Sequence, residues 1–250
     1  MNPLLKLLAD NRGRGVFRVD NKAADEATIY LYGAIVSDNY WGDGIAAIDF
    51  VKALAGLDVK TIHLRIDSPG GEVFAGQSMA QAIREHAATV IAHIDGLAAS
   101  AASWVALAAD EVVISQGGMI MIHQAQGIAV GNAAELRGTA DLLEKVDGIL
   151  VAGYVAETGQ SEQQITDWMA AETWFSAEEA VANGFADAIA TGGGNSNQGT
   201  GWNLAAYSHA PATPPAAAAV PESAPVDNPT IIDATEHLRR RLRVKETESA

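Results

Sequence analysis

The sequence predicts an α/β protein in which helices cover a mainly parallel β-sheet. Segments rich in β-branched and aromatic residues alternate with segments whose apolar residues recur at helical spacing. This alternation is typical of parallel strands joined by crossover helices. The apolar fraction of 48% and the charged fraction of 19% are typical of a globular domain rather than a disordered chain.

The expected elements follow in order along the chain. Strands are expected at 27–32, 61–66, 89–94, 111–114 and 119–122. Helices are expected at 44–57, 73–86 and 132–158, and the small-residue segment at 96–109 is expected to become helical. Ser161 and Ser176 are each followed three residues later by Gln or Glu, which is the capping-box pattern of a helix start.

Composition changes sharply after residue 190. Residues 191–200 read TGGGNSNQGT, and residues 211–229 are rich in Pro and Ala. No internal repeat is visible. We therefore expect four parts, namely a basic N-terminal segment at 1–23, a folded domain at 24–190, a flexible Gly/Pro/Ala-rich linker at 191–230, and a basic tail at 231–250 with a short helix.

The net charge is −15, from 31 acidic and 16 basic side chains, and it is unevenly distributed. Residues 27–190 hold 21 acidic and 6 basic side chains, whereas both ends are basic. The basic residues of the ends are Lys6, Arg12, Arg14, Arg18, Lys22, Arg239, Arg240, Arg241, Arg243 and Lys245. Because the acidic body would repel phosphates, we expect no nucleic-acid partner.

The chain contains no cysteine, which excludes disulfides, thiolate metal sites and a cysteine nucleophile. The longest uncharged apolar stretch, at 96–109, is about two-thirds of the length that spans a bilayer. We therefore expect a soluble cytoplasmic protein with no metal, no cofactor and no membrane partner.

The motif Ser68-Pro69-Gly70-Gly71 directly follows an expected strand. It could be a plain turn between a strand and a helix. It could also be a site of backbone donors, because glycines allow close approach to a ligand and a helix N-terminus directs N–H groups at negative charge. Such a site suits an oxyanion hole. The motif alone supports both interpretations equally.

Ser100 begins the helical part of the small-residue segment, where the helix end would stabilise negative charge developing on its oxygen. Ser103, one turn further along, is the competing candidate. The interpretation without chemistry is a close-packed helix whose serines bond to carbonyl groups one turn back.

A nucleophilic serine needs a base. His123 ends an expected strand and begins a Gly-containing loop, which is where α/β sheets carry reactive groups. His63 and His93 lie in the middle of strands and His86 at a charged helix end, so His123 is favoured.

The third group needed is an acid that orients the imidazole. Glu172 and Asp167 are the local candidates, and from the residues alone Glu172 is better interpreted as a surface carboxylate.

Taken together, these residues resemble the proteolytic subunit of Clp protease. The resemblance covers residues 27–189 and rests on five blocks in the family's order: IDSPGGEVFAG, GLAAS, MIHQ, a long helix ending in TGQS, and FSAEEAVANGFAD. It implies the crotonase-like ββα superhelix. It also implies that Ser100 is the nucleophile, that His123 is the general base, and that Glu172 takes the place where the family usually has Asp.

The same resemblance implies a set of backbone contacts around the nucleophile. Gly71 and Ala101 match the oxyanion-hole donors, and Gly70 and Val73 are expected to bind substrate.

Other sequence motifs point to a subgroup of this family. NPLLKLLADNRGRG, HIDGLAASAAS, AETWFSAEEA and the basic tail are similar to the Clp-like head maturation proteases of tailed phages and prophages. This similarity implies a serine endopeptidase that cleaves scaffold and capsid proteins, and itself, in the assembling prohead. It also implies a homo-oligomeric ring that works without an unfolding ATPase of the AAA+ type.

Several alternatives are open. One is a housekeeping Clp-type peptidase fed by an ATPase ring, and another is a scaffold or assembly module on the same fold. A Ser–Lys peptidase would need a lysine near the serine, and Lys145 in the middle of a helix is the one available in the later half of the domain. An acyl-CoA hydratase would use the backbone N–H groups of the oxyanion hole without needing Ser100.

Overall fold

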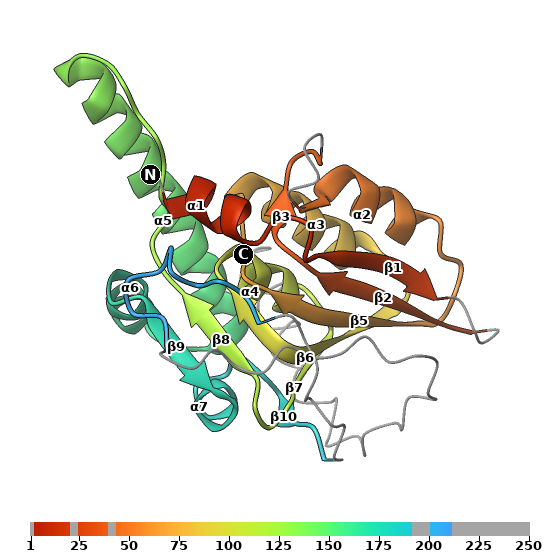
Figure 1. Ribbon diagram of the computed structural model, residues 1–250. Helices are drawn as coiled ribbons and strands as arrows, with labels where there is room; N and C mark the ends of the chain where they lie inside the picture. The colour runs from red at the N-terminus through yellow and green to blue at the C-terminus, as the bar shows by residue number, and fades with distance from the viewer. Residues whose placement is uncertain (1–2, 21–24, 40–43, 192–200, 212–250) are drawn as a thin grey trace, which may run out of the picture.

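The computed structural model describes residues 3–20, 25–39, 44–191 and 201–211. Its centre is an eight-stranded sheet in the order β1-β2-β5-β6-β7-β10, from which β8 and β9 branch at β6 (Figure 1). The pairings are parallel except β1 with β2 and β8 with β9. The expected α/β class with a mainly parallel sheet is confirmed.

The strands and helices have the following bounds. The strands are β1 (Val16–Asp20), β2 (Glu26–Tyr32), β3 (Ile35–Val36), β4 (Ile45–Ala46), β5 (Thr61–Ser68), β6 (Thr89–Ala99), β7 (Glu111–Ile114), β8 (Met119–Ile122), β9 (Thr173–Ser176) and β10 (Ala188–Ile189). The helices are α1 (Pro3–Asp10), α2 (Ala47–Ala55), α3 (Val73–Glu85), α4 (Ala101–Ala106), α5 (Ala133–Thr158), α6 (Glu162–Ala170) and α7 (Ala177–Ala182).

The core lies between the central strands and the helices packed on them. Strands β5 and β6 are buried along nearly their whole length, as expected for parallel strands covered on both faces. Helices α2 and α3 contribute apolar side chains from one face each, including Phe50, Leu54, Met79 and Ile83. This packing fixes the carboxyl ends of β5 and β6, where the site residues begin.

Strand β6 is longer than the sequence predicts. Residues 96–99 continue the strand, because Leu97, Ala98 and Ala99 pair with β8. The helix of the small-residue segment is therefore confined to α4, and its N-cap is Ser100. Strand pairing overrides the helical preference of the alanines here.

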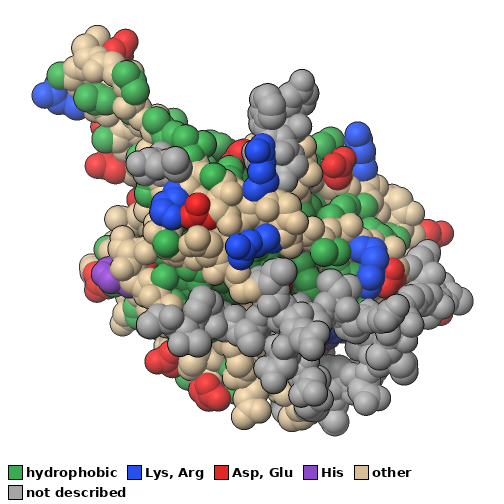
Figure 2. All heavy atoms as spheres, viewed as in Figure 1, with side chains coloured by type: hydrophobic (Ala, Val, Ile, Leu, Met, Phe, Trp, Pro, Cys, Tyr) green, Lys and Arg blue, Asp and Glu red, His purple; other side chains and the backbone are tan. Residues whose placement is uncertain are grey.

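Helix α5 begins with a full capping box between Asn132 and Glu135 and ends at Gly159, which is left-handed with φ of 72°. Its N-terminal half projects from the body (Figure 1). Leu136 and Leu142 are exposed in this half, and apolar side chains are visible over the projection in Figure 2. Ile149 is exposed in the other half of the helix. Of the two expected capping boxes further on, the one at Ser176 is complete, whereas Ser161 makes only the bond from the Gln164 amide.

The parts outside the expected domain differ from expectation where the structure describes them. Residues 3–20 form α1 and an edge strand of the main sheet rather than a separate basic segment. Within the expected flexible linker, residues 201–211 pack on the domain, and Trp202 and Leu204 are buried against Leu97, Ala99 and Met121. We call these residues the 201–211 segment. The expected basic tail at 231–250 lies outside the described residues.

Two histidines face each other inside the sheet. His63 of β5 and His93 of β6 are buried, and their ring nitrogens Nδ1 and Nε2 lie 2.9 Å apart. Burial lowers the pKa of both, that of His93 to about 3. The nearby Arg65–Asp95 ion pair adds a cation that disfavours a second positive charge.

We expect acid to destabilise the fold through this pair. An unfolded histidine binds a proton below a pKa of about 6.5 and the buried His93 does not, so stability is present above that pH and is lost as the pH falls. The expected loss between pH 7 and pH 5 is about 2 kcal/mol for His93. Denaturant unfolding at both pH values measures it. A His63→Leu/His93→Leu double variant should show a flatter dependence, and an equal slope in the two proteins would contradict this assignment.

Candidate active site

Ser100 lies at the junction of β6 and α4. Its N–H donates to the Met121 carbonyl at 2.8 Å, which fixes the junction to β8. Its Oγ lies 2.8 Å from Nε2 of His123. A hydroxyl and an imidazole nitrogen at this distance form a hydrogen bond through which a proton can pass.

The backbone at the site is strained at two positions. Among the described residues, the non-glycine residues with positive φ are Ser100 (52°) and Glu172 (51°). Residues other than glycine rarely adopt positive φ, and such backbone strain persists where surrounding contacts enforce it. Both residues were candidates from the sequence, so the strain coincides with the candidate site.

His123 follows directly after β8 and is half-buried. Burial lowers its pKa, while the negative charge of Glu172 acts in the opposite direction. The imidazole is therefore neutral at pH 7 and its Nε2 can accept the proton of the Ser100 hydroxyl.

Gly70 and Gly71 follow β5 in conformations that favour glycine, with φ of 86° and 153°. A side chain on Gly70 would meet the Ala99 carbonyl and Ser100, and one on Gly71 would meet the Ile35 backbone. The Gly70 carbonyl and the Glu72 N–H both bond to Ile35, so the N–H of Gly71 between them points the other way. In the described part of the chain that N–H has no hydrogen-bond partner.

Glu172 is buried immediately before β9, and its carboxylate is held by the 201–211 segment. The N–H of Ser208 donates to Oε2 at 2.9 Å and the N–H of His209 donates to Oε1 at 2.6 Å. No hydrogen bond joins Glu172 to His123 within the described residues. Asp167 is exposed on α6 and accepts from Gln163, so it does not take part in the site.

The other candidates are accounted for by structural contacts. Ser103 is fully buried and its hydroxyl bonds to the Ser100 carbonyl and to the Tyr154 hydroxyl. The ring of His86 accepts from the Ala88 N–H. Lys145 is exposed on α5, so a Ser–Lys pair with Ser100 has no support.

Tyr207 was missed by the sequence reasoning. Its ring packs edge-to-face on the His123 imidazole with centroids 5.5 Å apart, and on Trp174 at 5.7 Å. Its hydroxyl donates to the Pro69 carbonyl at 2.6 Å. The available signal was the spacing of apolar residues in GWNLAAY, which is unlike the flanking Gly-rich and Pro/Ala-rich stretches.

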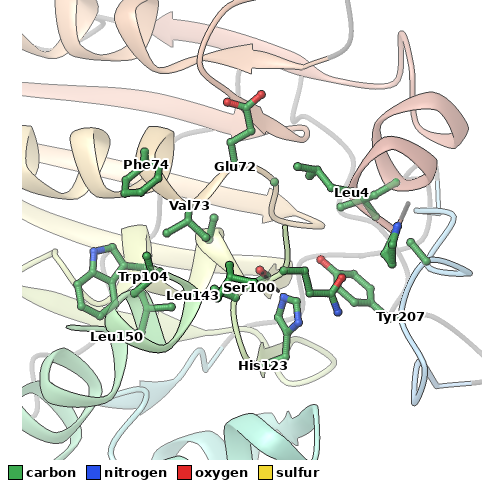
Figure 3. Close-up of a pocket in the computed structure, with 18 of the residues that line it drawn as sticks. Leu4, Glu72, Val73, Phe74, Ser100, Trp104, His123, Leu143, Leu150 and Tyr207 are labelled. Carbon is green, nitrogen blue, oxygen red and sulfur yellow. Dashed lines mark hydrogen bonds between the residues drawn. The ribbon is translucent and has the colours of Figure 1, made fainter. Parts of the chain in front are cut away.

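A cavity of about 260 Å³ opens beside Ser100 (Figure 3). Its walls are mostly apolar and come from α1, the start of α3, α5 and the 201–211 segment. Gly71, Val73, Ser100, Ala101 and His123 all line it, so the expected substrate-binding Val73 and the expected oxyanion donors face the same space. Ala101 is the first residue of α4, where backbone N–H groups have no partner within the helix.

The described residues contain no cluster of His, Asp and Glu that could hold a metal ion. No helix among them is long and apolar enough to cross a membrane. The groups gathered beside the cavity are a hydroxyl, an imidazole, a carboxylate and backbone N–H groups, which are the groups that acyl-transfer enzymes use.

A serine hydroxyl bonded to an imidazole, beside backbone N–H groups, is the arrangement found in serine hydrolases. The family model for Clp protease matches residues 11–193, and the chain therefore belongs to this family of serine peptidases. Among solved structures, it is similar to a point mutant of ClpP1 from Listeria monocytogenes, with a TM-score of 0.58 and 26% identity. That match covers 66% of this chain and 91% of the other.

Proposed function

We propose that this protein is a serine endopeptidase that matures phage heads by cleaving scaffold and capsid proteins. The observation that carries the peptidase part is the 2.8 Å contact between Ser100 Oγ and His123 Nε2, beside a Gly71 N–H that has no partner among the described residues. The head-maturation part rests on the similarity of the sequence motifs given above to those of phage head maturation proteases.

In the proposed first half-reaction, Ser100 Oγ attacks the carbonyl carbon of a peptide bond while His123 Nε2 takes its proton. The N–H groups of Gly71 and Ala101 stabilise the oxyanion of the tetrahedral intermediate. His123 then gives its proton to the departing amine, and an ester forms between Ser100 and the N-terminal part of the substrate.

In the second half-reaction, water attacks that ester. His123 takes a proton from the water, the oxyanion forms again between the same two N–H groups, and the proton returns to Ser100 as the carboxylic acid leaves. The negative charge of Glu172 stabilises the transient imidazolium of His123, which is consistent with its effect on the pKa of that histidine.

The role of Glu172 is tested by removing its charge, a change that also replaces one of the two oxygens that accept from the backbone N–H groups of Ser208 and His209. Glu172→Gln keeps the size of the side chain, and we expect it to lower kcat/KM by roughly 10²–10⁴-fold because the imidazolium loses its counter-charge. The matched control is Asp167→Asn on the exposed face of α6, which should retain activity within about twofold since surface substitutions have small effects. Peptide hydrolysis by the two variants measures this. Equal activities would remove Glu172 from the proposed triad.

We further propose a homo-oligomeric ring in which α5 contributes to contacts between subunits. The exposed Leu136, Leu142 and Ile149 of α5 support this, because large apolar side chains left exposed on a protruding helix are typical of an interaction surface. No dedicated unfolding ATPase is expected for this assembly.

The head-maturation role is tested by incubating the purified protein with the scaffold and capsid proteins encoded beside it, using Ser100→Ala as the control. Cut sites are mapped by mass spectrometry. We expect cleavage of scaffold and of the protein's own tail without ATP. If the wild type hydrolyses short peptides but degrades folded proteins only with an ATP-driven unfoldase, the housekeeping peptidase is the correct function. The family membership and the similarity to a ClpP1 keep that candidate open.

A further inference from the structure

We propose that the 201–211 segment is a working part of the active site, in which Tyr207 positions His123 and the backbone N–H groups of Ser208 and His209 position Glu172. The inference rests on the proposed peptidase function. The segment lies beyond residue 193, where the match to the family model ends, so the matched part of the chain does not contain it.

The segment is anchored on the strands that carry the site. Trp202 and Leu204 are buried against β6 and β8. Strand β6 ends directly before Ser100, and strand β8 ends directly before His123. The Trp202 indole N–H donates to Asp67 Oδ1 at 2.8 Å, next to the glycine turn. The backbone of Asn203 makes two hydrogen bonds with the Asn11 side chain, of 2.8 and 2.9 Å. These contacts fix the residues that follow.

Tyr207 then connects two parts of the site. Its ring lies edge-to-face on His123 and is itself held by Trp174, which packs edge-to-face on it. Its hydroxyl holds the Pro69 carbonyl, which immediately precedes Gly70 and Gly71. One side chain thus supports both the imidazole and the turn that presents the Gly71 N–H.

Ser208 and His209 act on the acid. Each N–H donates to a different oxygen of the Glu172 carboxylate, and the His209 ring bonds to the Ala171 carbonyl. A glutamate has one more methylene than the aspartate expected at this position, so it has more conformations to restrict. Two backbone amides on one carboxylate restrict its conformation and hold it in one place in the site.

The segment supports the site rather than closing it. The cavity beside Ser100 remains open with Tyr207 as one wall, and Ser100 Oγ keeps its hydrogen bond to His123 (Figure 3). A blocking segment would instead fill that cavity or separate the serine from the histidine.

The test uses the full chain with Tyr207→Ala, Tyr207→Phe and, as a matched control, Tyr30→Ala, which removes a buried tyrosine that does not line the cavity. Steady-state hydrolysis of a short fluorogenic peptide is measured against pH, together with the melting temperature. For Tyr207→Ala we expect kcat to fall roughly ten- to hundredfold with little change in KM, because the imidazole is misplaced.

The pH profile separates positioning from mere stability. The groups that contact His123 or act on its charge are Ser100, Glu172 and Tyr207. Asp147 of α5 is a further acid near this loop and accepts from the Ala125 N–H, two residues after His123. Removing the Tyr207 ring admits water to the imidazole, so the pKa of His123 rises and the acid limb of kcat/KM moves to higher pH. Tyr207→Phe should leave the acid limb of kcat/KM at the same pH. Tyr30→Ala should lower the melting temperature and also leave the acid limb at the same pH.

Two results would overturn the inference. Higher activity in Tyr207→Ala would mean that the 201–211 segment blocks the active site. An unchanged kcat and an unchanged acid limb of the pH profile would mean that the segment only attaches to the domain. Tyr207→Leu, which keeps much of the volume, gives the same comparison if Tyr207→Ala does not fold. Failure of the peptidase proposal is distinguishable, because the wild type itself would then be inactive.

Discussion

Ser100→Ala is expected to abolish peptide hydrolysis, with kcat reduced by about 10⁶-fold, as for other serine peptidases that lose the nucleophile. The variant should fold, because the Ser100 backbone bonds to Met121 and Ser103 do not involve its hydroxyl. The strained φ of 52° is compatible with Ala no less than with Ser.

Ser103→Ala is the matched control for this prediction. It removes a buried hydroxyl that bonds to the Ser100 carbonyl and to Tyr154, so we expect a loss of stability of about 1 kcal/mol and a retained hydrolytic rate. Turnover and denaturant unfolding are measured on both variants. Loss of activity in Ser103→Ala with activity kept in Ser100→Ala would reverse the assignment.

Gly71→Ala is the second change with a large expected effect. A methyl group at this position meets the Ile35 backbone, so the loop must shift and carry the Gly71 N–H away from the oxyanion. Losing one oxyanion donor costs about 10²–10³ in kcat. Peptide turnover and melting temperature are the measurements.

The control for Gly71→Ala is the same change on the exposed face of α5. Gly148 has nothing within 4 Å of where a Cβ would lie, so Gly148→Ala should keep full activity and gain up to about 1 kcal/mol of stability from helix propensity. A fully active Gly71→Ala that folds would exclude its N–H from the oxyanion hole.

Much of the fold was predictable because its signals are local. β-Branched runs mark β2, β5 and β7, and the apolar periodicity of α3 and α5 gives their extents to within a residue or two. His123 was predictable as a candidate because it lies where a strand ends, and Ser100 because it lies where a helix begins.

The rest depends on contacts between distant residues. The extension of β6 through Ala99 comes from pairing with β8, which no local preference among alanines reveals. The burial of Glu172 depends on the amides of Ser208 and His209, so its position alone indicated a surface carboxylate. The 201–211 segment lies between stretches of linker-like composition, and its order comes from Trp202, Leu204 and Tyr207 docking on the domain.

The most direct test of the account is the reaction of the full chain with a fluorophosphonate, followed by mass mapping of the labelled residue. A serine activated by a histidine reacts with this class of reagent, whereas an ordinary hydroxyl does not. The account predicts a single label on Ser100, loss of peptide hydrolysis in proportion to labelling, and no label in Ser100→Ala. An unlabelled wild type, or a label on another serine, would contradict it.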